Sequence, residues 1–162
     1  MEIQLWRSIL CPYELAVREL EVKFNHIIDE CKENDVYCPI EQVEGRVKSV
    51  SSILEKMQRK HIPMERMEEE VEDIAGIRII CSFREDIYFL ADCLLEQDDI
   101  TLIQRKDYIE NPKENGYRSL HLIVEVPIFL EHKKKMMKVE VQLRTIAMDF
   151  WASLEHKLKY KK

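Results

Sequence analysis

The sequence predicts an α/β domain built on a mixed β-sheet that is flanked by helices. Segments with helical apolar spacing alternate with short apolar or alternating segments, in the order α-β-α-β-α-β-β-β-α. The chain has 162 residues, of which 46% are hydrophobic, and this is enough to bury one core without metals or disulfides. We therefore expect a single domain over residues 1–162.

The first predicted element is a helix over residues 12–33. Pro12 suits the first turn of a helix, and apolar residues then recur at helical spacing. A short strand is expected over residues 41–48. The next helix lies in "SVSSILEKMQRKH", where serines can cap the start.

A buried strand and a further helix are expected in the middle of the chain. The acidic stretch "MERMEEEVED" leads into "IAGIRIICSF", whose apolar run predicts the strand. The helix "REDIYFLADCLLEQ" follows, with Ser82 and Glu85 at the spacing of a capping box.

The last part of the chain is predicted to contain three strands and a helix. The strands cover residues 100–108, 118–127 and 136–144, and the last two form an antiparallel pair joined through "IFLEHKKK". The final helix begins at about Thr145.

Alternation along the paired strands separates an apolar face from a polar face. If the apolar rows share one side of the sheet, the opposite side carries His121, Glu140, Gln142 and Arg144, and alternation also assigns Ser119 to that side. An ordinary antiparallel sheet with one solvated face fits the same pattern.

Each of the three glycines lies just before a basic residue, in "EGRVKS", "DIAGIR" and "NGYRS", which suggests a shared ligand. A polyphosphate would suit the basic side chains near these motifs and on the polar face. Asp73 and Glu140 are candidate carboxylates for the Mg²⁺ that accompanies such a ligand. A solvated acidic run for Asp73 and a cross-strand charge partner for Glu140 are the alternatives. The basic candidates are Arg46, Lys48, Lys56, Arg78, Lys113 and Arg144.

Several function classes are disfavoured. The chain has no G-x-x-x-x-G-K-[ST], G-x-G-x-x-G, H-R-D or H-E-x-x-H motif, so side chains would have to hold the phosphates. Five cysteines without a C-x-x-C pair favour neither zinc nor disulfides and point to the reducing cytoplasm. A net charge of −6 disfavours duplex DNA, and no segment approaches the length of a membrane span.

Four ordered segments resemble the small alarmone synthetases, the single-domain members of the RelA/SpoT family. They are "GRVKSVSSILEKMQRK", "EDIAGIRIICSF", "KENGYRSLHLIVEVP" and "VEVQLRTIAMDFWASLEHKLKYK". The resemblance covers roughly residues 40–162, the expected catalytic core, and residues 1–39 match only as an N-terminal helix. It implies a nucleotidyltransferase-like fold and a GTP pyrophosphokinase, in which the 3′-hydroxyl of GTP or GDP attacks the β-phosphorus of ATP to give pppGpp or ppGpp and AMP.

The resemblance also implies residue roles on the ATP side of the site. The arginines of the "GR" and "AGIR" motifs hold adenine in this family, which assigns that role to Arg46 and Arg78. Lys48, Ser52 and Lys56, one turn apart along a helix, would reach the ATP phosphates.

On the acceptor side, the tyrosine of the G-Y-R-S motif stacks on guanine, which implies that role for Tyr117. Lys113 and His121 would lie near the GTP phosphates, and Asp73 and Glu140 would bind Mg²⁺. Gln142 and Arg144 would continue the polar row beside them.

The chain departs from the family pattern in three places. Asp149 stands where many relatives have Asn in "MNFW", and Lys106 aligns with a position that is often Arg; either change would alter the preference for GTP or GDP. The chain also ends soon after "LEHKLKYK", whereas relatives usually continue into helices used for assembly, so we expect those helices to be absent here and a tetramer only in a full-length form.

Two other functions remain open at this level. One is a catalytically silent module that binds nucleotides or single-stranded RNA through its basic clusters and Tyr117. The other is a pyrophosphate transfer onto RNA ends. For the synthetase itself, an allosteric alarmone or single-stranded RNA is the further partner left open. Alarmone hydrolysis is not expected, because the resemblance implies that bifunctional relatives use a separate domain with a His-Asp motif, and none of the five histidines here precedes an aspartate.

Overall fold

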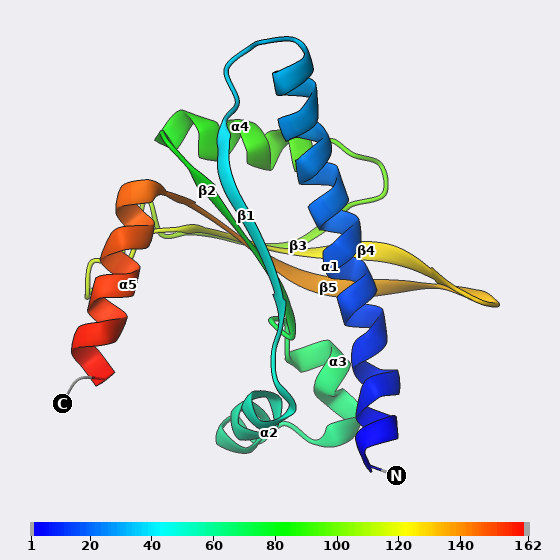
Figure 1. Cartoon of the computed structure of the whole chain (residues 1–162). Coiled ribbons are helices and arrows are strands. Elements are labelled where there is room, and N and C mark those ends of the chain that lie inside the picture. Colours follow the sequence, from blue (N-terminus) through cyan, green and yellow to red (C-terminus); the bar gives the residue numbers. More distant parts are fainter. Residues whose placement is uncertain (1, 161–162) are drawn as a thin grey trace.

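A five-stranded mixed sheet in the order β1-β2-β5-β4-β3 forms the centre of the computed structural model (Figure 1). The structure describes residues 2–160, and only the backbone at those two ends. Strand β2 runs parallel to β5 and the other neighbours are antiparallel, which confirms the predicted mixed sheet. The strands are β1 (Ile40–Val47), β2 (Ala75–Cys81), β3 (Thr101–Asp107), β4 (Leu120–Leu130) and β5 (Lys133–Thr145).

Helices lie on both sides and at the lower end of this sheet in Figure 1. Helices α1 and α4 contact the sheet through the apolar core, and α5 stands on the opposite side. They are α1 (Glu2–Glu33), α2 (Val50–Arg59), the 3₁₀ turn η1 (Met64–Arg66), α3 (Met67–Glu70), α4 (Arg84–Leu95) and α5 (Ile146–Tyr160).

Helix α1 begins ten residues earlier than the sequence indicated, and Pro12 lies inside it. Proline disfavours a helix interior by about 3 kcal/mol, so the sequence places Pro12 in the first turn. Trp6, Ile9 and Leu10, all N-terminal to the proline, pack against the core. This tertiary packing stabilises the added turns.

The expected capping box at the start of α4 is wrong by one residue. The Ser82 hydroxyl donates instead to Glu41 Oε1 at 2.6 Å on the adjacent strand. The carboxylate of Asp86 accepts from the backbone N–H of Phe83 at 3.3 Å and so caps the helix. A long-range hydrogen bond therefore overrides the local sequence signal.

The hairpin between β4 and β5 is tighter than expected. The strands continue to Leu130 and from Lys133, so only two residues form the turn. Ser119 is also not on a solvated face: it is fully buried, and its hydroxyl donates to the carbonyl oxygen of Leu143 at 3.2 Å.

The sheet has one apolar and one polar face, as alternation predicts. Leu122 pairs with Val141 and Val124 with Val139, and all four side chains are fully buried under the helices. The other face of the same strands carries the polar residues described next, and it faces away from α1.

Candidate functional site

The predicted polar row exists on β4 and β5. Gln142 donates to Glu140 Oε1 at 2.7 Å, and Arg144 donates to Gln142 Oε1 at 3.0 Å. His121 lies directly opposite Gln142 in the strand register, with Nδ1 3.8 Å from Glu140 Oε2. These side chains form one hydrogen-bonded row, so the face is an ordered polar surface and not a set of independent solvated residues.

The loop after β3 brings Tyr117 to the end of this row. The Tyr117 hydroxyl lies 2.8 Å from His121 Nε2 and accepts from Arg144 at 2.8 Å. Gly116 precedes it with φ +86°, a conformation that favours glycine. An added Cβ there would lie 3.3 Å from Trp151 Nε1, so α5 supports the loop from behind.

Tyr108, which the sequence did not single out, completes an aromatic cluster with Tyr117 and His121. Its ring centroid lies 6.1 Å from that of Tyr117 and 5.2 Å from that of His121, both in edge-to-face geometry. Lys113 Nζ lies 4.8 Å from the Tyr108 centroid and 5.3 Å from that of Tyr117. The cluster offers aromatic surface and positive charge together.

His121 is held in its neutral form. Burial is the main cause that lowers its pKa, from 6.5 to about 4, and the positive charges of Arg144, Lys113 and Lys106 act in the same direction. Glu140 opposes the shift but does not outweigh it. The imidazole can therefore donate one hydrogen bond at neutral pH without carrying charge.

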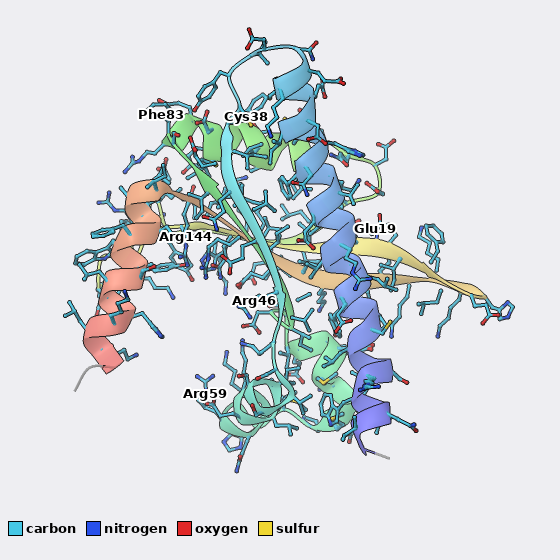
Figure 2. All side chains as sticks on the ribbon, viewed as in Figure 1. Glu19, Cys38, Arg46, Arg59, Phe83 and Arg144 are labelled. Carbon is cyan, nitrogen blue, oxygen red and sulfur yellow. The ribbon has the colours of Figure 1, made fainter. Side chains whose placement is uncertain are left out.

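The two arginines expected to hold a base lie side by side on β1 and β2. Arg46 pairs with Gly76 in the register, and an added Cβ on Gly76 would lie 3.8 Å from the Arg46 guanidinium. Arg78 lies between Glu44 on β1 and Gln142 on β5. Figure 2 shows Arg46 and Arg144 on the side of the sheet that faces α5.

These arginines border a small cavity of about 30 Å³ that reaches Glu140 and Gln142. The Nε atom of Arg78 is buried without a hydrogen-bond partner among the described residues. An unpaired buried donor is costly, and such atoms in native proteins commonly await a ligand or water.

Lys48 and Lys56 converge on Asp73 below the arginines. Their ammonium groups lie 3.0 and 2.7 Å from its two carboxylate oxygens. Burial alone would raise the pKa of Asp73, but the hydrogen bonds and charges of the two lysines outweigh it and lower the pKa below 3.8. Asp73 is therefore ionised at neutral pH.

The sequence predicts that Lys48, Ser52 and Lys56 lie one turn apart along one helix. This prediction is wrong for Lys48, which lies before the helix begins. Ser49 is the N-cap of α2, and its hydroxyl accepts from the Ser52 backbone N–H at 3.2 Å, so Lys48 precedes the helix. The backbone N–H of Lys48 instead bonds Ile74 O at 2.7 Å. This bond directs the lysine to Asp73 from the β1 side.

The three glycines have different structural roles. Gly45 is explained by close packing, because an added Cβ would overlap Val17 of α1. An added Cβ on Gly76 would meet Arg46 only at ordinary contact distance, and Gly116 turns the Tyr117 loop. Packing against α1 accounts for Gly45, so the idea of one shared ligand behind all three glycines is wrong for that residue.

A family model described as "Region found in RelA / SpoT proteins" matches residues 45–162. The chain belongs to the RelA/SpoT family. It is 48% identical over 158 residues to the GTP pyrophosphokinase YwaC of Bacillus subtilis, a match that covers 96% of this chain and 75% of that protein.

Solved structures of this family share the fold. Small alarmone synthetase 1 from Bacillus subtilis bound to its product pppGpp has a TM-score of 0.91 and 46% identity, covering 98% of this chain and 82% of that one. The same protein bound to AMPCPP has a TM-score of 0.82 and 42% identity, covering 98% and 79%.

Asp149 and Lys106, the two residues that differ from the family pattern, are connected to the Tyr117 cluster in different ways. Asp149, in the first turn of α5, accepts from Arg144 at 3.0 Å. Arg144 itself is buried, and its Nε lacks a partner among the described residues. Lys106 is exposed and lies opposite His121 on β3.

A cleft of about 580 Å³ opens between the polar side of the sheet and α5 of this RelA/SpoT member. Arg78, Tyr117 and Arg144 line it from the sheet side, and His156, Lys157 and Lys159 line it from the helix.

Within residues 2–160, no helix combines the length and apolarity needed to cross a membrane.

Proposed function

We propose that this chain is a GTP pyrophosphokinase that transfers pyrophosphate from ATP to the 3′-hydroxyl of GTP or GDP. The observation that carries the proposal is the presence of two separate groups of basic and aromatic side chains, joined by one polar row. One contains the arginine cavity and the paired lysines, and the other contains the Tyr117 cluster. The Glu140–Gln142–Arg144 row joins them, so two nucleotides would meet at Glu140.

The donor half is the group on β1, β2 and α2. Arg46 and Arg78 have flat guanidinium groups that suit stacking on a base. Lys48 and Lys56, with Ser52 in the first turn of α2, supply positive charge and donors for phosphates. ATP would displace the lysines from Asp73, because the triphosphate offers more negative charge than one carboxylate.

The acceptor half is the aromatic cluster. Tyr117 offers a ring for guanine, and Lys113 with neutral His121 offers donors for the phosphates. Base stacking on an aromatic ring contributes about 1–3 kcal/mol. Arg144 fixes the position of Tyr117 through the hydroxyl, and Asp149 holds Arg144; Lys106 adds charge at the open side.

Asp73 and Glu140 suit Mg²⁺ as a donor set. Magnesium in phosphoryl-transfer sites usually takes one or two carboxylates together with substrate phosphates and waters. Within residues 2–160, no group of three or more His, Cys, Asp or Glu side chains is placed to hold a metal ion. When bound, the ion would neutralise charge on the phosphates.

Gly76 pairs with Glu140 in the β2–β5 register, and Asp73 lies three residues before Gly76. The two carboxylates therefore come from neighbouring segments on one edge of the site. Their meeting at one ion is part of the proposal.

Glu140 is the residue we assign to the proton of the acceptor. Its Oε1 already accepts from Gln142, while Oε2 contacts, among the residues that the structure describes, His121 alone at 3.8 Å. In the reaction, the 3′-oxygen forms a bond to the β-phosphorus of ATP as the bond between that phosphorus and the α–β bridging oxygen breaks. The hydroxyl proton passes to Glu140 or through it to water, and AMP leaves.

Incubation of the purified chain with ATP labelled at the β-phosphorus tests the proposal. Label appearing in pppGpp or ppGpp, with equal AMP, supports it. Label on RNA ends would select pyrophosphate transfer to RNA, and nucleotide binding without product would select a silent module. A further arm with added ppGpp tests hydrolysis, for which we expect no pyrophosphate release.

A further inference from the structure

Glu44 is an acidic side chain at the donor half that the motifs do not explain. It lies on β1 two residues before Arg46 and lines the small cavity together with Arg46, Arg78 and Glu140. It is exposed, and it makes no hydrogen bond or ion pair with any described residue.

The lack of an ion pair is informative because Glu44 and Arg78 are direct cross-strand partners. Opposite charges at such positions face the same side of the sheet and ordinarily attract each other. Here neither side chain forms a salt bridge with the other, and the Arg78 Nε remains buried and unpaired. Arg46 likewise has no ion-pair or hydrogen-bond partner within residues 2–160.

The chemistry of this group favours a flat ring with a donor edge over a phosphate. Glu44 and Glu140 both border the cavity, and two carboxylates would repel a phosphate placed there. Guanidinium planes stack on heteroaromatic rings, and a carboxylate accepts hydrogen bonds from an amino group on the ring edge.

We propose that Glu44 determines the choice of donor nucleotide by accepting a hydrogen bond from the 6-amino group of adenine between Arg46 and Arg78. This inference rests on the proposed function for the placement of ATP. A 6-oxo base presents an acceptor at that position, so the carboxylate of Glu44 would face a second acceptor and disfavour it.

The test compares binding and turnover of ATP and ITP, which differ at the 6-position, in three forms of the chain. The wild type is expected to prefer ATP by about ten-fold or more, the usual effect of one hydrogen bond to a charged group. In Glu44→Gln the preference should fall to about three-fold or less, because the amide can turn its NH₂ toward the 6-oxo group. Glu44→Ala should bind ATP more weakly and lose most of the preference.

Glu19→Gln is the matched control, since it removes the same charge from an exposed position on α1, which Figure 2 shows away from Arg46. It should keep the wild-type ratio. An unchanged ATP-to-ITP ratio in Glu44→Gln and Glu44→Ala would overturn the proposal. A change only in the ratio of ATP to 2′-deoxy-ATP would also overturn it, because Glu44 would then contact the ribose.

Equilibrium binding separates this inference from the proposed function. Selective ATP binding that depends on Glu44, without any transfer to GTP, would support the inference while contradicting the function. Transfer to GTP with no role for Glu44 would support the proposed function and contradict the inference. Absence of ATP binding by the wild type would contradict both the function and the inference.

Discussion

The hydroxyl of Tyr117 lies 2.8 Å from Nε2 of His121, and the same hydroxyl accepts from buried Arg144. The proposed base platform and the proposed phosphate donor are therefore one connected unit. Burial of His121 beside three cations keeps its imidazole neutral, with a pKa lowered to about 4.

This shift predicts a pH-dependent stability in magnesium-free buffer. The unfolded chain binds a proton at His121 near pH 6.5, whereas the folded chain does so only near 4. Between these values the unfolded state binds more protons, so the free energy of unfolding falls as pH falls from about 6.5 to about 4. Melting temperatures at pH 7.5 and 5 measure it.

His121→Asn serves as the comparison, since it keeps a polar side chain and removes the titration. Its melting temperature should drop less over the same interval than that of the wild type. Asp73 does not interfere, because the stability that its lowered pKa contributes is present above pH 3.8 and is lost only at lower pH. Parallel pH curves for the two proteins would contradict the prediction.

Tyr117→Ala should raise the KM for GTP by about 5-fold to 150-fold, because the stacking ring is lost, an effect of about 1–3 kcal/mol. Tyr117→Phe keeps the ring and removes the two hydroxyl contacts. We expect it to alter the KM for GTP only a few-fold and to lower stability by about 1 kcal/mol. Steady-state kinetics with each substrate varied separately measures both; a selective rise in the KM for ATP would refute the assignment.

Asp73→Asn and Glu140→Gln should each lower turnover by at least about 10²-fold, the scale of acid–base and electrostatic contributions. The double variant should be little worse, since groups that act together are not additive. Glu72→Gln, next to Asp73 in the chain, is the control and should retain activity. Near-wild-type turnover of either single variant at saturating Mg²⁺ would remove that carboxylate from the site.

The two carboxylates should differ in their effect on stability. Asp73 holds two lysines in partly buried ion pairs, so Asp73→Asn should lower the melting temperature clearly. Glu140→Gln can keep a hydrogen bond with Gln142 and should melt close to the wild type. Thermal unfolding of both variants at pH 7.5 tests this difference.

Gly116→Ala should destabilise the Tyr117 loop by about 1 kcal/mol or more, because an L-residue is strained at φ +86° and its Cβ would press on Trp151. Gly76→Ala is the contrast: its backbone has no positive φ, and its Cβ would meet neighbours only at ordinary contact distance. Chemical denaturation should show a larger loss for Gly116→Ala. Equal losses would show that the strain at Gly116 has no energetic effect.

Asp149→Asn should lower stability, since it removes the anion that pairs with a guanidinium only 7% exposed. Asp149→Asn and Lys106→Arg each restore the residue that is common in the family at that position. The ratio of GTP use to GDP use should therefore change in one or both of these single variants. An unchanged ratio in both would show that neither departure affects the acceptor preference.

Much of the fold followed from periodicity, because the buried faces of β2, β4 and β5 need alternating or continuous apolar residues. The polar row from His121 to Arg144 was predictable for the same reason. β4 and β5 are neighbours in the chain, and side chains alternate between the two faces of each strand, so the face of every residue can be assigned from its position. The start of α1 and the cap of α4 were not predictable from local signals. Packing of Trp6 against the core and the bond from Ser82 to Glu41 decide them.

The site residues that the sequence analysis missed could be found only once the order of the strands in the sheet was known. Tyr108 joins the aromatic cluster only because β3 pairs with β4, and Glu44 meets Arg78 only because β1 pairs with β2. In the sequence, the one signal for Glu44 was its position two residues before Arg46, which places both side chains on the same face of β1. The pairing of both lysines with Asp73 also depends on the contact between Lys48 and Ile74, which no spacing indicates.

The most direct test of the proposed function follows the β-phosphorus of ATP by ³¹P NMR in a mixture of chain, ATP, GTP and Mg²⁺. The account predicts that this phosphorus appears as the 3′-linked phosphate of pppGpp, in step with AMP, for the wild type and not measurably for Glu140→Gln over the same time. Release of ADP and phosphate, or of AMP and free pyrophosphate, with no 3′-linked product would contradict it.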